Sequence, residues 1–121
     1  MKKILIADDD TFFQKFYSSQ LKETGFEVDV AVNGIEALEK LKSFKPDLML
    51  LDLIMPEKDG FEVLTEKGAD AAIKNIPVII FSTLGQEKDV QRTKELGAIG
   101  YINKSFFDFD ALVAKIKEIV K

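Results

Sequence analysis

Short apolar runs alternate with longer amphipathic stretches along the chain. Five runs are typical of β-strands and occupy residues 4–7, 28–30, 48–51, 78–81 and 99–102. Each is followed by a stretch with apolar residues at helical spacing, at 11–24, 33–45, from Gly60 onward, 86–96 and 109–120. This alternation predicts five βα units, and therefore a parallel sheet with helices on both faces and right-handed crossovers.

Individual residues sharpen the helix predictions. The apolar face of the first helix comprises Phe13, Phe16, Tyr17 and Leu21. Phe12 lies off this stripe and is expected to point outward, beside the end of the preceding strand. Gly25 suits the end of the same helix, and Asn33 with Glu36 three residues on predicts an N-cap for the second. Gly68 interrupts the third helix and should soften its end.

Length, charge and composition exclude several classes of function. The chain has 121 residues and a formal net charge of −4. We expect one domain over residues 1–121, with no output domain attached. Cys and His are absent, which excludes imidazole or thiolate zinc sites and nucleophiles activated by His. The acidic balance argues against direct binding of nucleic acid, and no stretch is long enough for a membrane span, so we expect a cytoplasmic protein.

Polar residues that could carry chemistry follow four of the five predicted strands. In open α/β sheets, ligands bind beyond the carboxyl ends of the strands. Asp8 and Asp9 follow the first strand, Asp52 the third, Ser82 the fourth and Lys104 the fifth. Three carboxylates at one edge would repel one another, and Mg²⁺ with oxygen ligands would relieve the repulsion. Lys104 and Ser82 could then hold the oxygens of a phosphoryl group on Asp52.

Each of these residues also has an ordinary structural explanation. Acidic residues after a strand are often solvated turns or helix N-caps, as we expect for Asp10. A single Asp, Ser or Lys at a strand end carries little weight alone. The functional interpretation depends on all of them following the expected strands in one order.

That order resembles the response-regulator receiver family over essentially the whole chain. The resemblance is carried by Asp8-Asp9, by the segment from Asp52 to Gly60 with the sequence DLIMPEKDG, by residues 77–82 with the sequence PVIIFS, and by Lys104. It implies a flavodoxin-like doubly wound α/β fold, with five parallel strands in the order 2-1-3-4-5 and five helices.

The resemblance assigns roles to the residues around Asp52. Asp52 would be the phospho-acceptor and a Mg²⁺ ligand, with Asp9 as a direct ligand and Asp8 as a further one. Ile54 would give its backbone carbonyl to the same Mg²⁺ ion. Lys104 would pair with a phosphoryl oxygen.

Two further residues would report the phosphorylated state. Ser82 would be the switch hydroxyl that moves toward the phosphoryl group, and Tyr101 the switch aromatic whose rotamer follows it. The surface that changes would comprise the fourth helix, fifth strand and fifth helix.

The resemblance also implies partners. A histidine kinase or a phosphotransfer protein would supply the phosphoryl group, and an unknown protein would receive the signal. The chain would be a monomer or a weak dimer that depends on phosphorylation. It would catalyse its own phosphorylation and slow dephosphorylation, and it would not be an enzyme with a separate substrate.

Three positions depart from the family pattern. Ser105 follows Lys104 where Pro is usual, which predicts a more mobile loop. Thr83 stands where Ala is common and narrows access to Asp52, and Gly68 lies within the third helix. No catalytic group is lost.

Three alternatives remain open at this point. A phosphatase of the haloacid-dehalogenase type uses similar groups, but it requires Asp-x-Asp where this chain has Asp52-Leu53-Ile54. A module on the same fold that acts without phosphorylation is a second alternative. A flavodoxin is the third, although no Ser/Thr/Gly-rich phosphate loop follows the first strand.

Overall fold

Five strands form one parallel sheet in the computed structural model, which describes residues 1–120. The strands are β1 (Lys3–Ala7), β2 (Glu27–Ala31), β3 (Leu48–Leu51), β4 (Val78–Ser82) and β5 (Gly100–Asn103). They lie in the order β2-β1-β3-β4-β5 with all neighbouring pairs parallel, which confirms the predicted topology. The order reverses between β1 and β3, and the carboxyl ends of these two strands therefore flank the crevice in which such folds bind ligands.

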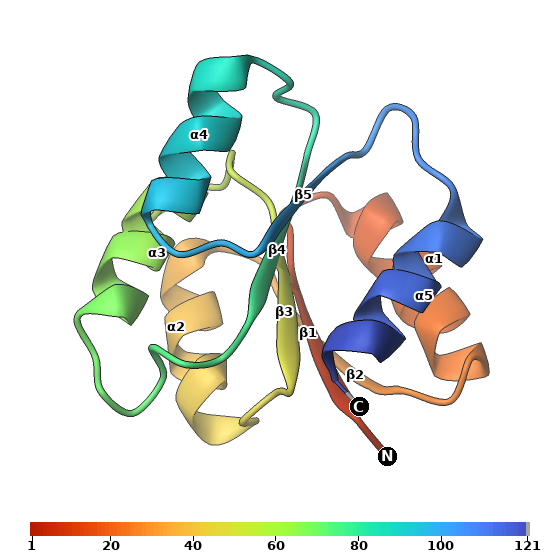
Figure 1. The fold of residues 1–121 in the computed structure, drawn as a ribbon. Helices are drawn as coiled ribbons and strands as arrows, with labels where there is room; N and C mark the ends of the chain where they lie inside the picture. The colour runs from red at the N-terminus through yellow and green to blue at the C-terminus, as the bar shows by residue number, and fades with distance from the viewer. Residues whose placement is uncertain (121) are drawn as a thin grey trace.

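Helices cover both faces of the sheet (Figure 1). Helices α1 (Thr11–Glu23) and α5 (Phe109–Ile119) pack on one face, and α2 (Gly34–Ser43), α3 (Gly60–Gly68) and α4 (Glu87–Glu95) lie on the other. The predicted helices are thus all present, with ends that differ by one or two residues. Among the described residues, no helix combines the length and apolar character needed to cross a membrane.

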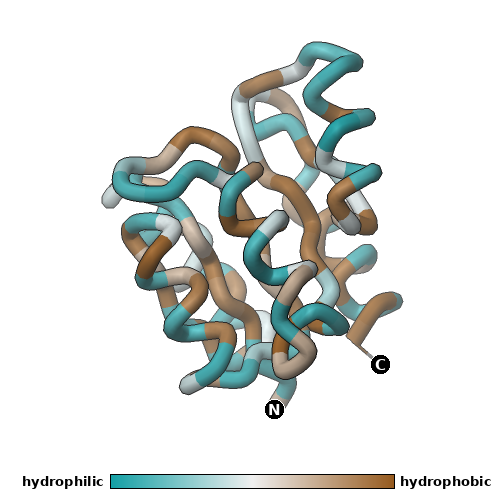
Figure 2. The backbone as a smooth tube through the Cα atoms, turned by 90° about the vertical axis from the view of Figure 1, so that its left-hand side faces the viewer, coloured by the Kyte–Doolittle hydropathy of each residue, from teal (hydrophilic) through white to brown (hydrophobic). Residues whose placement is uncertain are grey.

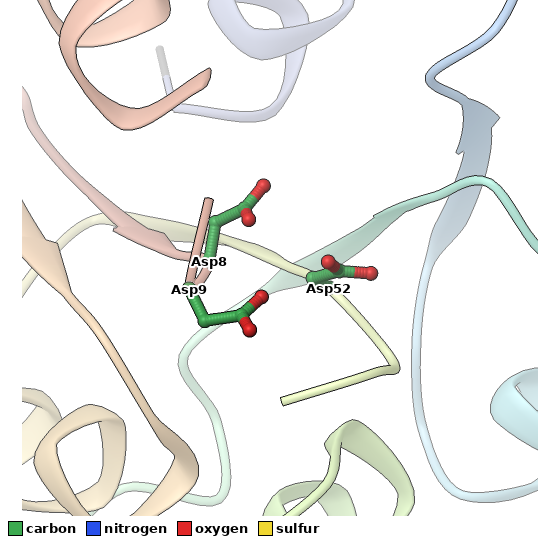
Figure 3. A group of neighbouring side chains, drawn as sticks. All are labelled: Asp8, Asp9 and Asp52. Carbon is green, nitrogen blue, oxygen red and sulfur yellow. The ribbon is translucent and has the colours of Figure 1, made fainter. Parts of the chain in front are cut away.

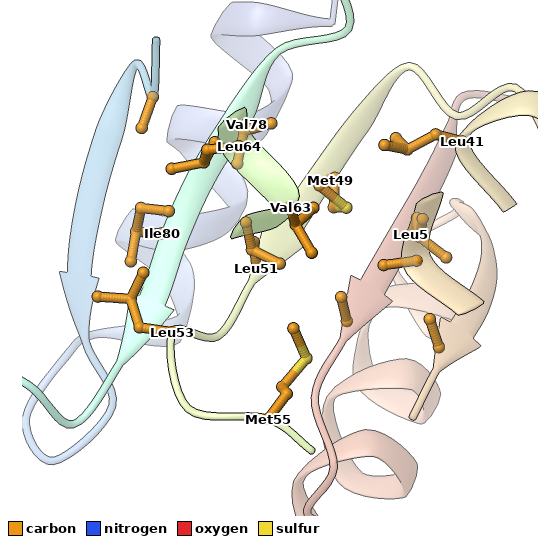
Figure 4. Close-up of a cluster of buried hydrophobic side chains, with 14 of the residues drawn as sticks. Leu5, Leu41, Met49, Leu51, Leu53, Met55, Val63, Leu64, Val78 and Ile80 are labelled. Carbon is orange, nitrogen blue, oxygen red and sulfur yellow. The ribbon is translucent and has the colours of Figure 1, made fainter. Parts of the chain in front are cut away.

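The core consists of two apolar layers separated by the sheet. Because successive strand residues point to opposite faces, each central strand supplies both layers. Leu5, Met49, Leu51 and Ile80 pack with α2 and α3 (Figure 4), whereas Ile4, Ile6, Leu50 and Ile79 pack with α1 and α5. Burial on both faces explains why the central strands are continuous apolar runs, visible as brown segments inside the molecule in Figure 2.

Side-chain caps fix where α1, α2 and α3 begin. The carboxylate of Asp10 accepts a hydrogen bond from the Phe13 N–H at the start of α1. Asn33 accepts from the Glu36 N–H at the start of α2, as predicted. Asp59 and Glu62 form a capping box at the start of α3. These caps set the point at which the chain turns from each strand end into the next helix.

One local prediction is wrong. Phe16 was expected on the buried face of α1, but its side chain is 43% exposed and stacks on Phe12 one turn earlier. The buried face instead includes Gln14, together with Leu21. The fifth strand, expected at 99–102, is present one residue later, from Gly100 to Asn103, and the Ile99 N–H still donates to the Val78 carbonyl of β4.

Candidate functional site

Backbone hydrogen bonds of the sheet hold the predicted site residues in place. The N–H of Asp8 donates to the Ala31 carbonyl at 2.9 Å, and the N–H of Asp52 donates to the Ala7 carbonyl at 2.9 Å. The N–H of Lys104 donates to the carbonyl of Ser82 at 3.0 Å. The ladder therefore extends one residue beyond each strand, and it fixes the backbone from which these side chains project.

Three carboxylates converge at this edge of the sheet (Figure 3). Asp8, Asp9 and Asp52 each offer an oxygen, and these oxygens lie within 4.8 Å of one another. Asp8 is 2% exposed and Asp52 is 8% exposed, whereas Asp9 is open to solvent. Burial raises the pKa of the Asp8 carboxyl above its ordinary value, against the opposing effect of its hydrogen bond from Lys104.

Lys104 pairs with both buried carboxylates. Its Nζ donates to Asp52 Oδ2 at 3.0 Å and to Asp8 Oδ2, and its side chain is almost wholly buried. One ammonium therefore faces three carboxylates, counting Asp9. The excess of negative charge at this largely buried site attracts a further cation.

The donor set fits a hard divalent cation. Each buried carboxylate has one oxygen held by the backbone, because Asp8 Oδ1 accepts from the Asp10 N–H at 2.9 Å and Asp52 Oδ1 accepts from the Leu53 N–H at 2.7 Å. The carboxylates are thus oriented before any ligand arrives. Oxygen ligands on a fixed frame, open to solvent at Asp9, suit an ion that retains water.

Ser82 and Tyr101 both contact the loop that follows β4. The Ser82 side chain is fully buried, and its Oγ accepts a hydrogen bond from the Leu84 N–H at 3.3 Å. The Tyr101 hydroxyl donates to the Leu84 carbonyl. The pKa of Tyr101 is raised, first by burial and then by the negative charges of Asp89 and Asp52. Ser82 on β4 and Tyr101 on the neighbouring strand β5 thus both hydrogen-bond to the backbone of Leu84.

Three contacts in the site were missed by sequence reasoning. Gln14 is buried on α1, and its side-chain amide donates to the Asp8 carbonyl. The rings of Phe13 and Phe81 lie against the Lys104 ammonium, with its Nζ 4.6 and 5.8 Å from the two ring centroids. A polar residue within an apolar helical stripe was the available signal for Gln14. The two Phe residues looked like ordinary core.

Two of the three departures from the family pattern, Ser105 and Thr83, lie around the same edge, whereas Gly68 lies at the far end of α3. No cis peptide bond occurs among the described residues, so the Lys104–Ser105 bond is trans. The Ser105 N–H donates to Asn103 Oδ1 at 2.8 Å. The greater mobility expected of this loop stays a prediction. Thr83 is exposed on the β4–α4 loop, and α3 ends at Gly68.

Comparison with known proteins agrees with this geometry. The sequence model of the protein family described as the response regulator receiver domain matches residues 4–117. The chain is 37% identical over 106 residues to the chemotaxis protein CheY of Halobacterium salinarum, covering 87% of this chain and 86% of that one. It is 39% identical over 122 residues to the CpxR homolog of Haemophilus influenzae, a transcriptional regulatory protein, covering 100% of this chain and 51% of that protein.

Solved structures show the same architecture. The receiver domain of the Francisella response regulator 1452 superposes with a TM-score of 0.91 at 29% identity, covering 99% of this chain and 97% of that one. The curated relatives differ in length from this chain. It spans about half of several of them, such as the 51% of the CpxR homolog given above.

Proposed function

Because this chain belongs to the response regulator receiver domain family of two-component systems, we propose that its Asp52 accepts a phosphoryl group. Phosphorylation is typical of the family, whose receiver domains interact with kinases or phosphotransfer proteins. The observation that carries the assignment is the position of the Asp52 carboxylate. It lies at the point where the strand order reverses, beside two other carboxylates and 3.0 Å from the Lys104 ammonium.

The chemistry requires a carboxylate nucleophile and charge stabilisation. An oxygen of Asp52 forms the new P–O bond while the P–N bond to the histidine of the donor breaks. The electron pair of that bond stays on the imidazole, which then takes a proton from solvent. Lys104 would hold a phosphoryl oxygen, a role that its contact with Asp52 Oδ2 supports. Transfer of this kind depends mainly on positioning and on neutralising charge.

Mg²⁺ is the cation we assign to the carboxylate cluster. Asp8, Asp9 and Asp52 would hold it, with the backbone carbonyl of Ile54 as a further ligand. When bound, Mg²⁺ supplies positive charge that offsets the carboxylates and the phosphoryl oxygens. Support for the assignment comes from the close approach of the three carboxylates to one another.

Ser82 and Tyr101 would convert the new phosphoryl group into a change of shape. Ser82 Oγ now accepts the Leu84 N–H, and the Tyr101 hydroxyl now donates to the Leu84 carbonyl. A phosphoryl oxygen would accept a hydrogen bond from the Ser82 hydroxyl and so draw the β4–α4 loop toward Asp52. The face built by α4, β5 and α5 would then differ between the two states.

The phosphodonor and the output partner are proteins in this account. A histidine kinase or phosphotransfer protein supplies the phosphoryl group, and the switched face binds a protein target without direct contact to nucleic acid. The chain itself provides the groups for its own phosphorylation and for slow hydrolysis, rather than turning over a separate substrate. If phosphorylation changes the oligomeric state, the phosphorylated chain forms a weak dimer.

Intact-mass measurement tests the assignment. Incubation with acetyl phosphate and Mg²⁺ should add one phosphoryl mass to the parent and none to Asp52→Asn. Asp110→Asn serves as the matched control, since Asp110 is exposed on α5 and has no part in the site. A chelator should prevent labelling of the parent. Labelling of Asp52→Asn to the level of the parent would refute the proposal.

A further inference from the structure

The Lys104 ammonium lies over the faces of two aromatic rings, in addition to its contacts with two carboxylates. Its Nζ is 4.6 Å from the centroid of the Phe13 ring and 5.8 Å from that of Phe81. Both distances are within the range of a cation–π interaction. The Lys104 side chain is 4% exposed, so little water competes for the charge. The ammonium therefore contacts two carboxylates, those of Asp8 and Asp52, and two ring faces.

The two rings are themselves held by their neighbours. Phe13 stacks on Tyr17 with centroids 5.5 Å apart, and Phe81 meets Tyr17 edge-on at 5.4 Å. Phe81 also meets Phe107 edge-on at 5.0 Å. The cluster joins α1, β4 and the β5–α5 loop, so the ring positions are set by three separate segments. A ring in such a cluster cannot turn away from Lys104 without disturbing the others.

A lysine needs this kind of support to act at one fixed point. Its four-carbon stem is flexible, and its ammonium is a compact charge without the rigid fork of arginine. Paired with two carboxylates alone, the ammonium could follow either of them. The two ring faces attract the cation and exclude water, and they restrict it to the space beside the Asp8 and Asp52 carboxylates.

We propose that Phe13 and Phe81 are positioning residues that hold the Lys104 ammonium at Asp52 through their ring faces. In this role the rings act through Lys104, whose ammonium lies over their faces. This inference rests on the proposed function of Asp52, because the benefit of a fixed ammonium is faster phosphoryl transfer. The alternative is that both rings only fill space in the core.

Fluorination separates the electrostatic role from the packing role. Fluorine atoms withdraw electron density from the ring face while changing its volume little. Replacing Phe13 by mono-, di- and trifluorinated phenylalanine should lower the rate of labelling by acetyl phosphate in steps, by about 2- to 30-fold at the end of the series. The same series at Phe107 is the control, since Phe107 packs in the cluster without facing the ammonium.

A second measurement needs no phosphodonor. Hydrogens above an aromatic face are shielded, so the ε-methylene signal of Lys104 should lie upfield of the other lysines in the NMR spectrum. Phe13→Leu should return it toward them. An unshifted signal in the parent, or a labelling rate that ignores fluorination at Phe13, would overturn the positioning role. Absence of any labelling in the parent would instead overturn the proposed function, and the NMR shift would still decide the role of the rings.

Discussion

At the scale of single residues, Asp9 and Asp10 carry the same charge in different surroundings. Asp9 offers a carboxylate oxygen within 4.8 Å of those of Asp8 and Asp52. The Asp10 carboxylate accepts the Phe13 N–H and so caps α1. The two aspartates are adjacent in sequence, and their substitution by Ala removes one negative charge in either case. They form a matched pair for separating repulsion within the cluster from helix capping.

Asp9→Ala should stabilise the metal-free protein and abolish its response to Mg²⁺. Removal of one of three close carboxylates relieves repulsion, and it also removes a ligand. Asp10→Ala should cost about 1 kcal/mol through loss of the cap and leave Mg²⁺ affinity unchanged. Urea unfolding with and without Mg²⁺ measures both effects. If Asp9→Ala destabilised the protein and kept its Mg²⁺ response, the cluster would be structural.

The residues at the rim of the site should set the lifetime of the phosphorylated state. Hydrolysis requires a water in line with the acyl phosphate. By resemblance to the family, Ile54 and Leu84 stand beside that path, and neither side chain can accept a hydrogen bond from water. Ile54 is 57% exposed and Leu84 is half-buried, with exposed Thr83 next to it. An apolar rim does not orient the attacking water.

Polar replacements at the rim should therefore speed the loss of phosphate. Ile54→Asn and Leu84→Glu each provide a group that can position the water, which can change a rate several-fold. Dephosphorylation of labelled protein, followed by intact mass, measures the rate beside that of the parent. Unchanged or slower loss in both variants would show that the lifetime is controlled elsewhere.

At the scale of elements, the start of α3 is packed tightly against the acceptor segment. A Cβ atom at Gly60 would lie 2.5 Å from the Asp52 carbonyl oxygen and 2.8 Å from the Leu53 Cα. The Gly60 N–H also donates to the Leu53 carbonyl at 2.9 Å. At Gly68, the last residue of the same helix, a Cβ would meet no atom within 4 Å. Helix α3 thus contains Gly60, where close contacts leave no room for a Cβ atom, and Gly68, where a Cβ atom would fit.

Gly60→Ala should cost about 1–3 kcal/mol and slow the labelling of Asp52, because the clash involves backbone atoms that must shift. Gly68→Ala should be neutral or stabilise by up to about 1 kcal/mol, since Ala favours the helix and fills open space. Urea unfolding and labelling rates of the two variants provide the comparison. Equal stability of both variants would contradict the contact at Gly60.

The elements differ in how far the sequence could predict them. The strands at 48–51 and 78–81 were clear because burial on both faces requires continuous apolar runs. The burial of Phe16 could not be predicted in this way. Helix α1 carries four aromatics in seven residues, and periodicity alone does not determine which of them face the sheet. Likewise, Asp8, Asp52 and Lys104 could be placed by their positions after strands. Contacts of Lys104 with rings from α1 and β4 depend on tertiary packing.

At the scale of the whole molecule, an exposed aromatic pair adjoins the site. Phe12 is 71% exposed and stacks on Phe16 with ring centroids 5.9 Å apart. Phe12 follows the acidic cluster by three residues and points outward from α1, as predicted. Phe106, two residues after Lys104, is 78% exposed on the β5–α5 loop. A phosphodonor protein that reaches Asp52 would meet this surface.

Phe12→Ala should slow phosphoryl transfer from the cognate kinase and leave labelling by acetyl phosphate intact. Loss of an exposed ring weakens docking of a protein donor, whereas a small donor needs no docking surface. Val32→Ala is the control, since Val32 is an exposed apolar residue that lies after β2. Equal loss with both donors would indicate a folding defect in place of a lost contact.

The most direct experiment identifies which residue carries the phosphoryl group in the labelled chain without substitutions. Borohydride reduces an aspartyl phosphate to homoserine, and peptide mass spectrometry then identifies the converted residue. After labelling with acetyl phosphate and Mg²⁺, homoserine should be found at position 52, with Asp8 and Asp9 unchanged. Homoserine at either of those two positions, or at none in protein that has gained the phosphoryl mass, would contradict the central claim that Asp52 is the acceptor.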